Sequence, residues 1–140
     1  MAYAGGSAAF GVGAHCASIT ESITLTKQDS GKVFFIGACA AKTTITLPSA
    51  KAGLNFKFIN SALNSADVDW DTGTASATAP DFYGVIHGAT VETSISAKRI
   101  ITLANAADAI GDMVEMISDG TNWFAHCVQM TDNAISGEDS

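Results

Sequence analysis

The chain has 140 residues, a formal net charge of −7 and a charged fraction of only 15%, against about 25% in typical soluble domains. This length fits one domain whose core can form without a disulfide or a structural metal. Lys and Arg form no cluster, which argues against nucleic acid and anionic membranes as partners, and no apolar run reaches the ~20 residues of a membrane span. The low charge suggests that neighbouring subunits cover much of the surface, with a monomer as the alternative.

The first segment, residues 1–18, is rich in Ala and Gly and shows neither helical nor strand periodicity. It is typical of an extended arm that is either disordered or ordered only by docking onto a partner, with Tyr3, Phe10 and Val12 as its anchors in the second case. It lacks the basic and apolar regions of a signal peptide, so we expect folding in a reducing cytosol. Free thiols are then expected at Cys16, Cys39 and Cys127.

From Ile19 onwards, apolar and polar residues alternate, which predicts short strands separated by turns. In the first half the expected strands are Ile19–Thr26, Val33–Ile36, Thr43–Leu47 and Leu54–Ile59. The tripeptide Ile-Thr-Leu begins at Ile23, Ile45 and Ile101. Its unequal spacing indicates a preference for threonine facing outward rather than a repeat array.

The second half continues this pattern up to an acidic tail. The expected strands are Asp67–Asp71, a weak Ala/Thr strand after Thr72-Gly73, Phe82–His87, Thr90–Ile95 and Arg99–Leu103. Residues 104–110 form one helical turn or a loop, and residues 131–140 form an acidic mobile tail. The chain therefore divides into an extended N-terminal arm (1–18), a β-sandwich domain (19–130) and the tail.

The strongest local signal is Asp119-Gly120 between two alternating runs, which predicts a hairpin with a two-residue type I′ turn. In that register Ser118 pairs with Thr121, Met116 with Trp123 and Val114 with Ala125. One face then carries the residues that we assign to the core: Val114, Met116, Trp123, Ala125 and Cys127. The predicted class is all-β, an antiparallel β-sandwich or jelly-roll-like barrel of short strands.

Asp67, Asp69 and Asp71 share one parity, so their carboxylates project from one side of a strand. Such oxygens suit Ca²⁺, but successive same-face residues are ~7 Å apart, too far to gather one ion without a bend. A solvated acidic edge is the preferred interpretation. Trp70, Phe82 and Tyr83 could form an aromatic platform for a sugar ring, with the three aspartates beside Trp70. Core or interface positions are at least as compatible with these three aromatic residues.

Three further arrangements of residues give only weak support for a metal, catalytic or phosphate site. His15-Cys16 and His126-Cys127 lack the close cysteine pairs of zinc sites, and neighbouring strand residues point to opposite faces. For Cys39 with His87 or His126, no neighbouring residue activates the thiol. The glycines near Gly11 lack the Lys-Ser/Thr of a phosphate loop. We therefore predict no catalytic residues, no metal, no cofactor and no enzymatic activity.

Two stretches resemble small β-rich virion surface proteins of tailed bacteriophages. The first runs from Ile23 to Phe34, through Thr44–Pro48, to Ala52–Ile59; the second combines Gly111-Asp112 with Ser118–Trp123. The resemblance covers about half of the chain, and residues 61–98 carry no match. It extends to capsid decoration (cement) proteins, head fibres and tail-fibre domains.

This resemblance implies a non-enzymatic virion component, a decoration protein that binds the major capsid protein on the outer surface of the head. It further implies a homotrimer, assembled in the host cytoplasm, that stabilises the shell. The alternatives are a tail-fibre or receptor-binding module that recognises host glycans, and a cellular β-sandwich binding domain. We expect deletion of residues 1–18 to abolish capsid attachment and to leave the β core folded.

Overall fold

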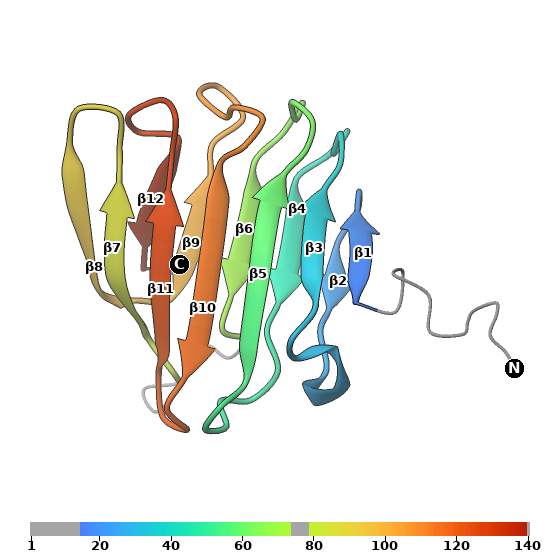
Figure 1. Cartoon of the computed structure of the whole chain (residues 1–140), viewed down its shortest axis with the longest axis vertical. Helices are drawn as coiled ribbons and strands as arrows, with labels where there is room; N and C mark the ends of the chain where they lie inside the picture. Colours follow the sequence, from blue (N-terminus) through green and yellow to red (C-terminus); the bar gives the residue numbers. More distant parts are fainter. Residues whose placement is uncertain (1–14, 74–78, 140) are drawn as a thin grey trace, which may run out of the picture.

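The computed structural model describes residues 15–73 and 79–139 and consists of two β-sheets that pack together (Figure 1). The large sheet has seven strands in the order β1-β3-β5-β10-β11-β7-β8, and the small sheet has five in the order β12-β9-β6-β4-β2. The all-β sandwich of short strands is thereby confirmed. The strands are β1 (Cys16–Ile19), β2 (Ile23–Thr24), β3 (Val33–Ile36), β4 (Thr43–Thr46), β5 (Asn55–Asn60), β6 (Val68–Asp71), β7 (Phe82–His87), β8 (Glu92–Lys98), β9 (Ile100–Leu103), β10 (Met113–Ser118), β11 (Trp123–Val128) and β12 (Ile135–Glu138).

Both sheets contain parallel as well as antiparallel strand pairs, which corrects the predicted antiparallel arrangement of the strands. The first six strands alternate between the sheets, and each lies parallel to the strand two before it in sequence: β1 with β3, β3 with β5, β2 with β4, and β4 with β6. The chain thus winds around the core before it forms antiparallel pairs such as β10–β11. Alternation of apolar and polar residues reports which side chains face inward, and it carries no information on strand direction.

The predicted strand Ile19–Thr26 is two strands, because the chain crosses from the large sheet to the small one between β1 and β2. Ile19 and Leu25 are both buried, so the inward parity continues around the corner. At the corner, the Ser22 hydroxyl accepts a hydrogen bond from the Thr44 amide. β1 also begins at Cys16, inside the segment predicted as an arm.

Two of the Ile-Thr-Leu tripeptides lie side by side in the small sheet. Ile23 pairs with Ile45, which pairs with Trp70, and Trp70 pairs with Ile101 of the third tripeptide. These residues form one row across the sheet despite their unequal spacing in sequence. The tripeptides therefore occupy aligned positions without being a repeat array.

Aromatic side chains fill the space between the sheets. Phe34 stacks on Phe58 with ring centroids 5.4 Å apart, and Phe56 lies 5.8 Å from Trp123, all on the large sheet. Phe58 meets the edge of Trp70 at 5.3 Å, which joins the large sheet to the small one. Both Trp side chains are at most 1% exposed, so each contributes a large buried apolar area.

The β10–β11 hairpin has a four-residue loop, so the predicted register is wrong by two residues. Ser118 pairs with Trp123, and Met116 pairs with Ala125. The Asp119 carboxylate explains the wider loop, because it accepts hydrogen bonds from the amides of Thr121 and Asn122, each at 2.8 Å. A shift of two preserves parity, and the predicted core face is confirmed: Val114, Met116, Trp123, Ala125 and Cys127 are all buried.

The predicted mobile tail contains a strand. β12 pairs antiparallel with β9 at the edge of the small sheet, and Ile135 is only 3% exposed. The Gln129 side-chain carbonyl also accepts a hydrogen bond from the Ile135 amide at 2.7 Å. The acidic composition of the tail obscured its short apolar segment.

Buried polar side chains tie together the loops at one end of the sandwich. The Asp112 carboxylate, 2% exposed, accepts hydrogen bonds from the amides of Ala109 and Met130, both at 2.8 Å. The Asn64 side chain donates to Asp108 at 2.8 Å and accepts from the Cys39 amide at 3.0 Å. The Gly-Asp pair that carries part of the phage resemblance therefore connects loops of the fold.

Candidate functional site

The aspartate row lies on the outer surface of the small sheet. β6 alternates, so Asp69 and Asp71 face outward whereas Trp70 faces the core. β6 lies between β4 and β9, near the middle of the small sheet. The row is therefore not at a sheet edge, which corrects that interpretation.

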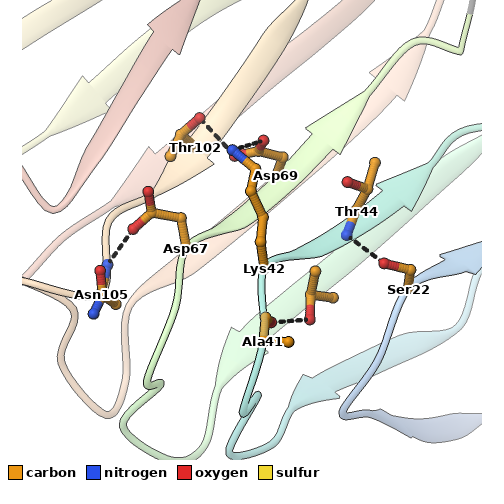
Figure 2. A network of polar contacts seen from close by, with 9 residues as sticks. Ser22, Ala41, Lys42, Thr44, Asp67, Asp69, Thr102 and Asn105 are labelled. Carbon is orange, nitrogen blue, oxygen red and sulfur yellow. Dashed lines mark hydrogen bonds and ion pairs between the residues drawn. The ribbon is translucent and has the colours of Figure 1, made fainter.

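Each aspartate of the row has its own partner, as Figure 2 shows for two of them. Asp69 accepts a hydrogen bond from the Thr102 hydroxyl at 2.8 Å and pairs with Lys42 Nζ at 2.9 Å. Asp67 accepts from the Asn105 amide at 2.9 Å, and Asp71 accepts from the Gly73 amide at 2.8 Å. The hydrogen bond and negative charge of Asp69 raise the pKa of Lys42. The carboxylates thus act separately and do not converge on one point.

The aromatic platform predicted from the sequence is not assembled. Trp70 and Phe82 are 1% and 0% exposed, so neither ring is available to stack on a sugar. Tyr83 faces outward on β7 and stacks on Phe124 of β11 with centroids 6.2 Å apart. The possible ligand-binding role of Trp70 is therefore wrong for the folded chain.

The cysteine and histidine candidates also separate. Cys39 and Cys127 are buried and Cys16 is half-buried, all three as free thiols. His126 points outward on β11 whereas Cys127 points into the core, where burial raises the pKa of its thiol to about 12. A thiol with such a pKa stays protonated and is a poor nucleophile or metal ligand at neutral pH. Within residues 15–73 and 79–139, no three His, Cys, Asp or Glu side chains could hold a metal ion together.

The outer surface of the large sheet carries a broad set of apolar side chains that the sequence analysis did not single out. We call it the apolar face. By strand register its members are Val33, Phe35, Ile59, Tyr83, Val85, Met113, Ile117, Phe124 and Val128. Phe35, Ile117 and Phe124 are 37%, 52% and 43% exposed. Figure 1 looks towards this sheet, with the small sheet behind it.

One row of ionisable side chains crosses the apolar face. Lys57 of β5, Glu115 of β10 and His126 of β11 are direct cross-strand neighbours. Glu115 lies 3.6 Å from Lys57 Nζ and 3.7 Å from His126 Nδ1, and all three side chains are 39–53% exposed. The His126 ring meets the His87 ring at 5.0 Å, and His87 Nδ1 pairs with Glu92 at 2.7 Å. Lys57, Glu115 and His126 also line an open depression of about 430 Å³ on this face.

The outer surface of the small sheet, which we call the polar face, has a different composition. Apart from Ile100, its strand residues are polar: Thr24, Thr44, Thr46, Asp69, Asp71, Thr102, Ser136 and Glu138. Asp69 and Thr102 satisfy each other and water can satisfy the exposed side chains, so this face needs no covering partner. The two faces of one sandwich therefore have opposite chemistry.

The predicted anchors Tyr3, Phe10 and Val12 lie outside the described residues. No helix in the described part of the chain is long and apolar enough to cross a membrane. Comparison with protein-family models gives no match, and neither the curated proteins nor the solved structures that were searched show a significant similarity to this chain.

Proposed function

We propose that this chain is a non-enzymatic virion structural protein, a decoration protein on the outer capsid surface of a tailed bacteriophage. The observation that carries the proposal is the opposite chemistry of the two outer faces, one apolar and one polar. A protein seated in a shell needs one surface that is covered in the assembly and another that stays in water. The resemblance of Gly111-Asp112 and Ser118–Trp123 to small phage virion proteins supports the same role.

The polar residues of that resemblance act on the fold. Asp112 receives two loop amides, Asp119 shapes the hairpin loop, and Asn122 accepts a hydrogen bond from the Asp81 amide at 3.1 Å. This favours a stiff building block over a catalyst, because the motif residues are engaged in holding loops. In this proposal the partners are the major capsid protein and further copies of the chain, as a homotrimer.

Capsid attachment is assigned to the N-terminal arm, with Tyr3, Phe10 and Val12 as anchors. Because β1 begins at Cys16, deletion of residues 1–18 would also remove most of that strand. The sharper test deletes residues 2–14 and measures co-sedimentation with undecorated capsids. We expect loss of binding with an unchanged far-UV circular dichroism spectrum.

A matched pair of variants separates anchoring from mere arm length. The first replaces Tyr3, Phe10 and Val12 by Ser, and the control replaces Ala4, Ala8 and Ala9 by Ser. Binding should be lost only in the first, because only it removes large apolar side chains. Binding by the deletion variant would exclude the arm as the anchor, and failure of the full chain to bind any capsid would exclude the decoration role.

Host-glycan recognition is the second candidate, favoured by the stack of the half-buried Tyr83 on the exposed Phe124. An aromatic pair on a sheet surface is a common way to hold a sugar ring. Glycan binding that is lost in Tyr83→Ala, in a protein that does not bind capsids, would favour this candidate.

A further inference from the structure

We propose that copies of this chain associate through the apolar face, with the large sheet of one copy laid against that of another. The inference rests on the part of the proposed function in which copies associate, and it gives a twofold dimer in place of the homotrimer. It is independent of whether the assembly then binds a capsid.

Two strands of the large sheet, β3 and β7, have the composition of strands that are covered on both sides. β3 reads Val-Phe-Phe-Ile and β7 reads Phe-Tyr-Gly-Val-Ile-His, whereas β4 of the small sheet reads Thr-Thr-Ile-Thr. Strands buried on both faces have near-continuous apolar runs, and strands with one wet face alternate. In the single chain only the inner face of the large sheet is covered, which leaves Ile117 and Phe124 in water.

The charges on the apolar face identify a second copy as the occupant. The centre of the face carries Lys57 and Glu115 side by side, and these two charges cancel, although the chain as a whole has a net charge of −7. The third full charge on this side of the sheet, Glu92, lies on the edge strand β8. Copies can therefore meet here while their acidic surfaces point away from each other. A partner with one sign of charge would be repelled by either Lys57 or Glu115.

The pattern is also self-complementary. In a twofold arrangement the same patch meets itself, so residue i contacts residue j and j contacts i. A twofold axis between β5 and β10 would place Lys57 of one copy opposite Glu115 of the other. Within one copy their contact is loose, at 3.6 Å, so both groups retain capacity for a partner across the interface.

The extent of the face matches a weak interface. The six strands other than β8, at ~4.8 Å spacing and with four to six residues of ~3.3 Å each, give about 500 Å² before side-chain relief is counted. A standard interface buries about 800 Å² on each partner. Contact across this sheet would therefore give a weak twofold dimer.

The first test compares two isoleucines of similar exposure by analytical ultracentrifugation. Ile117, 52% exposed, lies on the apolar face, and Ile110, 60% exposed, lies in the β9–β10 loop. The wild type should sediment as an oligomer, Ile117→Lys should weaken association by about tenfold or more, and Ile110→Lys should leave it unchanged. Circular dichroism spectra establish that the variants are folded. A monomeric wild type up to about 100 μM, or equal effects of the two substitutions, would overturn the proposal.

The second test uses only the charged pair and does not disturb apolar packing. Lys57→Glu gives a face with two acids, and Glu115→Lys gives a face with two bases. Each variant alone should associate less than the wild type, and an equimolar mixture should recover association, because opposite charges then meet between chains. If mixing restores nothing, the faces do not meet in this way.

The two tests contain no capsids, so their outcome is separate from that of the decoration role. Oligomers that do not bind capsids would leave this inference standing and remove the proposed function. Capsid binding by a protein that is monomeric in solution would support the proposed function and overturn this inference. Glycan binding at Tyr83 by a monomer would assign the apolar face to another occupant.

Discussion

The two outer faces of the sandwich differ although the two inner faces are alike. Inside, both sheets bury a tryptophan at most 1% exposed within one hydrophobic core. Outside, the small sheet shows threonines and aspartates, and the large sheet shows Phe35, Ile117 and Phe124. Folding of one chain therefore explains the inner faces, but it does not explain the apolar face.

The difference has a physical origin that can be read strand by strand. Folding stability depends mainly on the residues that face inward, and these are largely apolar in both sheets. The residues that face outward contribute less to folding and can serve solubility or association. The polar face carries paired carboxylates such as Asp69 with Lys42, whereas the centre of the apolar face carries only the loosely paired Lys57 and Glu115. Variants on the inner and outer parities should therefore separate stability from assembly.

The largest expected effect comes from the inner faces. Trp123→Ala and Trp70→Ala should each lower the free energy of unfolding by about 3–5 kcal/mol, because each removes a fully buried ring from packed surroundings. Urea denaturation followed by circular dichroism measures both. If Trp70→Ala instead cost less than ~1 kcal/mol and removed glycan binding, Trp70 would be a ligand contact and the two inner faces would not be equivalent.

The pH dependence of stability tests the contrast between inward and outward residues at Cys127, which faces the core next to the outward-facing His126. Burial raises the pKa of its thiol from 9.0 to about 12. Between these values the unfolded chain loses the proton and the folded chain keeps it, so stability falls as the pH rises. The loss is about 1.4 kcal/mol for each pH unit above 9.

The control for this pH dependence is Cys127→Ala, which lacks the thiol. Urea denaturation at several pH values between 8 and 11 should show a steeper decline for the wild type than for the variant. Parallel declines would mean that the thiol is not held protonated by the core. Slow reaction of Cys127 with a thiol reagent at pH 8 provides an independent measure of its burial.

The features of the fold that could be predicted from the sequence are those that follow from the alternation of inward-facing and outward-facing residues. Alternation located most strands within one or two residues and assigned the core face of the hairpin correctly, including Trp123 and Cys127. Alternation could not predict features that leave the pattern of inward-facing residues unchanged. Three such features are the strand directions, the corner between Ile19 and Leu25, and the two-residue shift of the hairpin.

The candidate site was harder to foresee for a related reason. A surface made of several strands is defined by register across the sheet, and Phe124 meets Tyr83 only because β11 lies next to β7. Nothing local in the sequence brings these residues together. The usable signal was the near-continuous apolar composition of strands such as β3, which indicates cover on both faces. For Trp70 the choice between the core and a ligand platform stayed open, because its aspartate neighbours suggested exposure.

The polar face should show a smaller effect than the core. Asp69→Ala removes a carboxylate that accepts from the buried Thr102 hydroxyl and pairs with Lys42, so we expect a loss of about 1.5–3 kcal/mol. Lys42→Ala is the matched control, because its side chain is 63% exposed and an exposed pair contributes less than about 1 kcal/mol. Chemical denaturation compares the two variants. Equal losses would show that the ion pair, rather than the buried hydrogen bond, stabilises this face.

The smallest effect on folding should come from Glu115→Gln on the apolar face. Its contacts with Lys57 and His126 are 3.6 Å and 3.7 Å long and largely in water, so the free energy of unfolding of the monomer should change by less than about 1 kcal/mol. The measurement is made in the Ile117→Lys background, where association is already weak. The same substitution in the otherwise wild-type chain should lower association measurably, because an interface leaves Lys57 of the other copy without its partner. A large loss of monomer stability with unchanged association would assign Glu115 to the fold, and the two outer faces would then differ in composition but not in role.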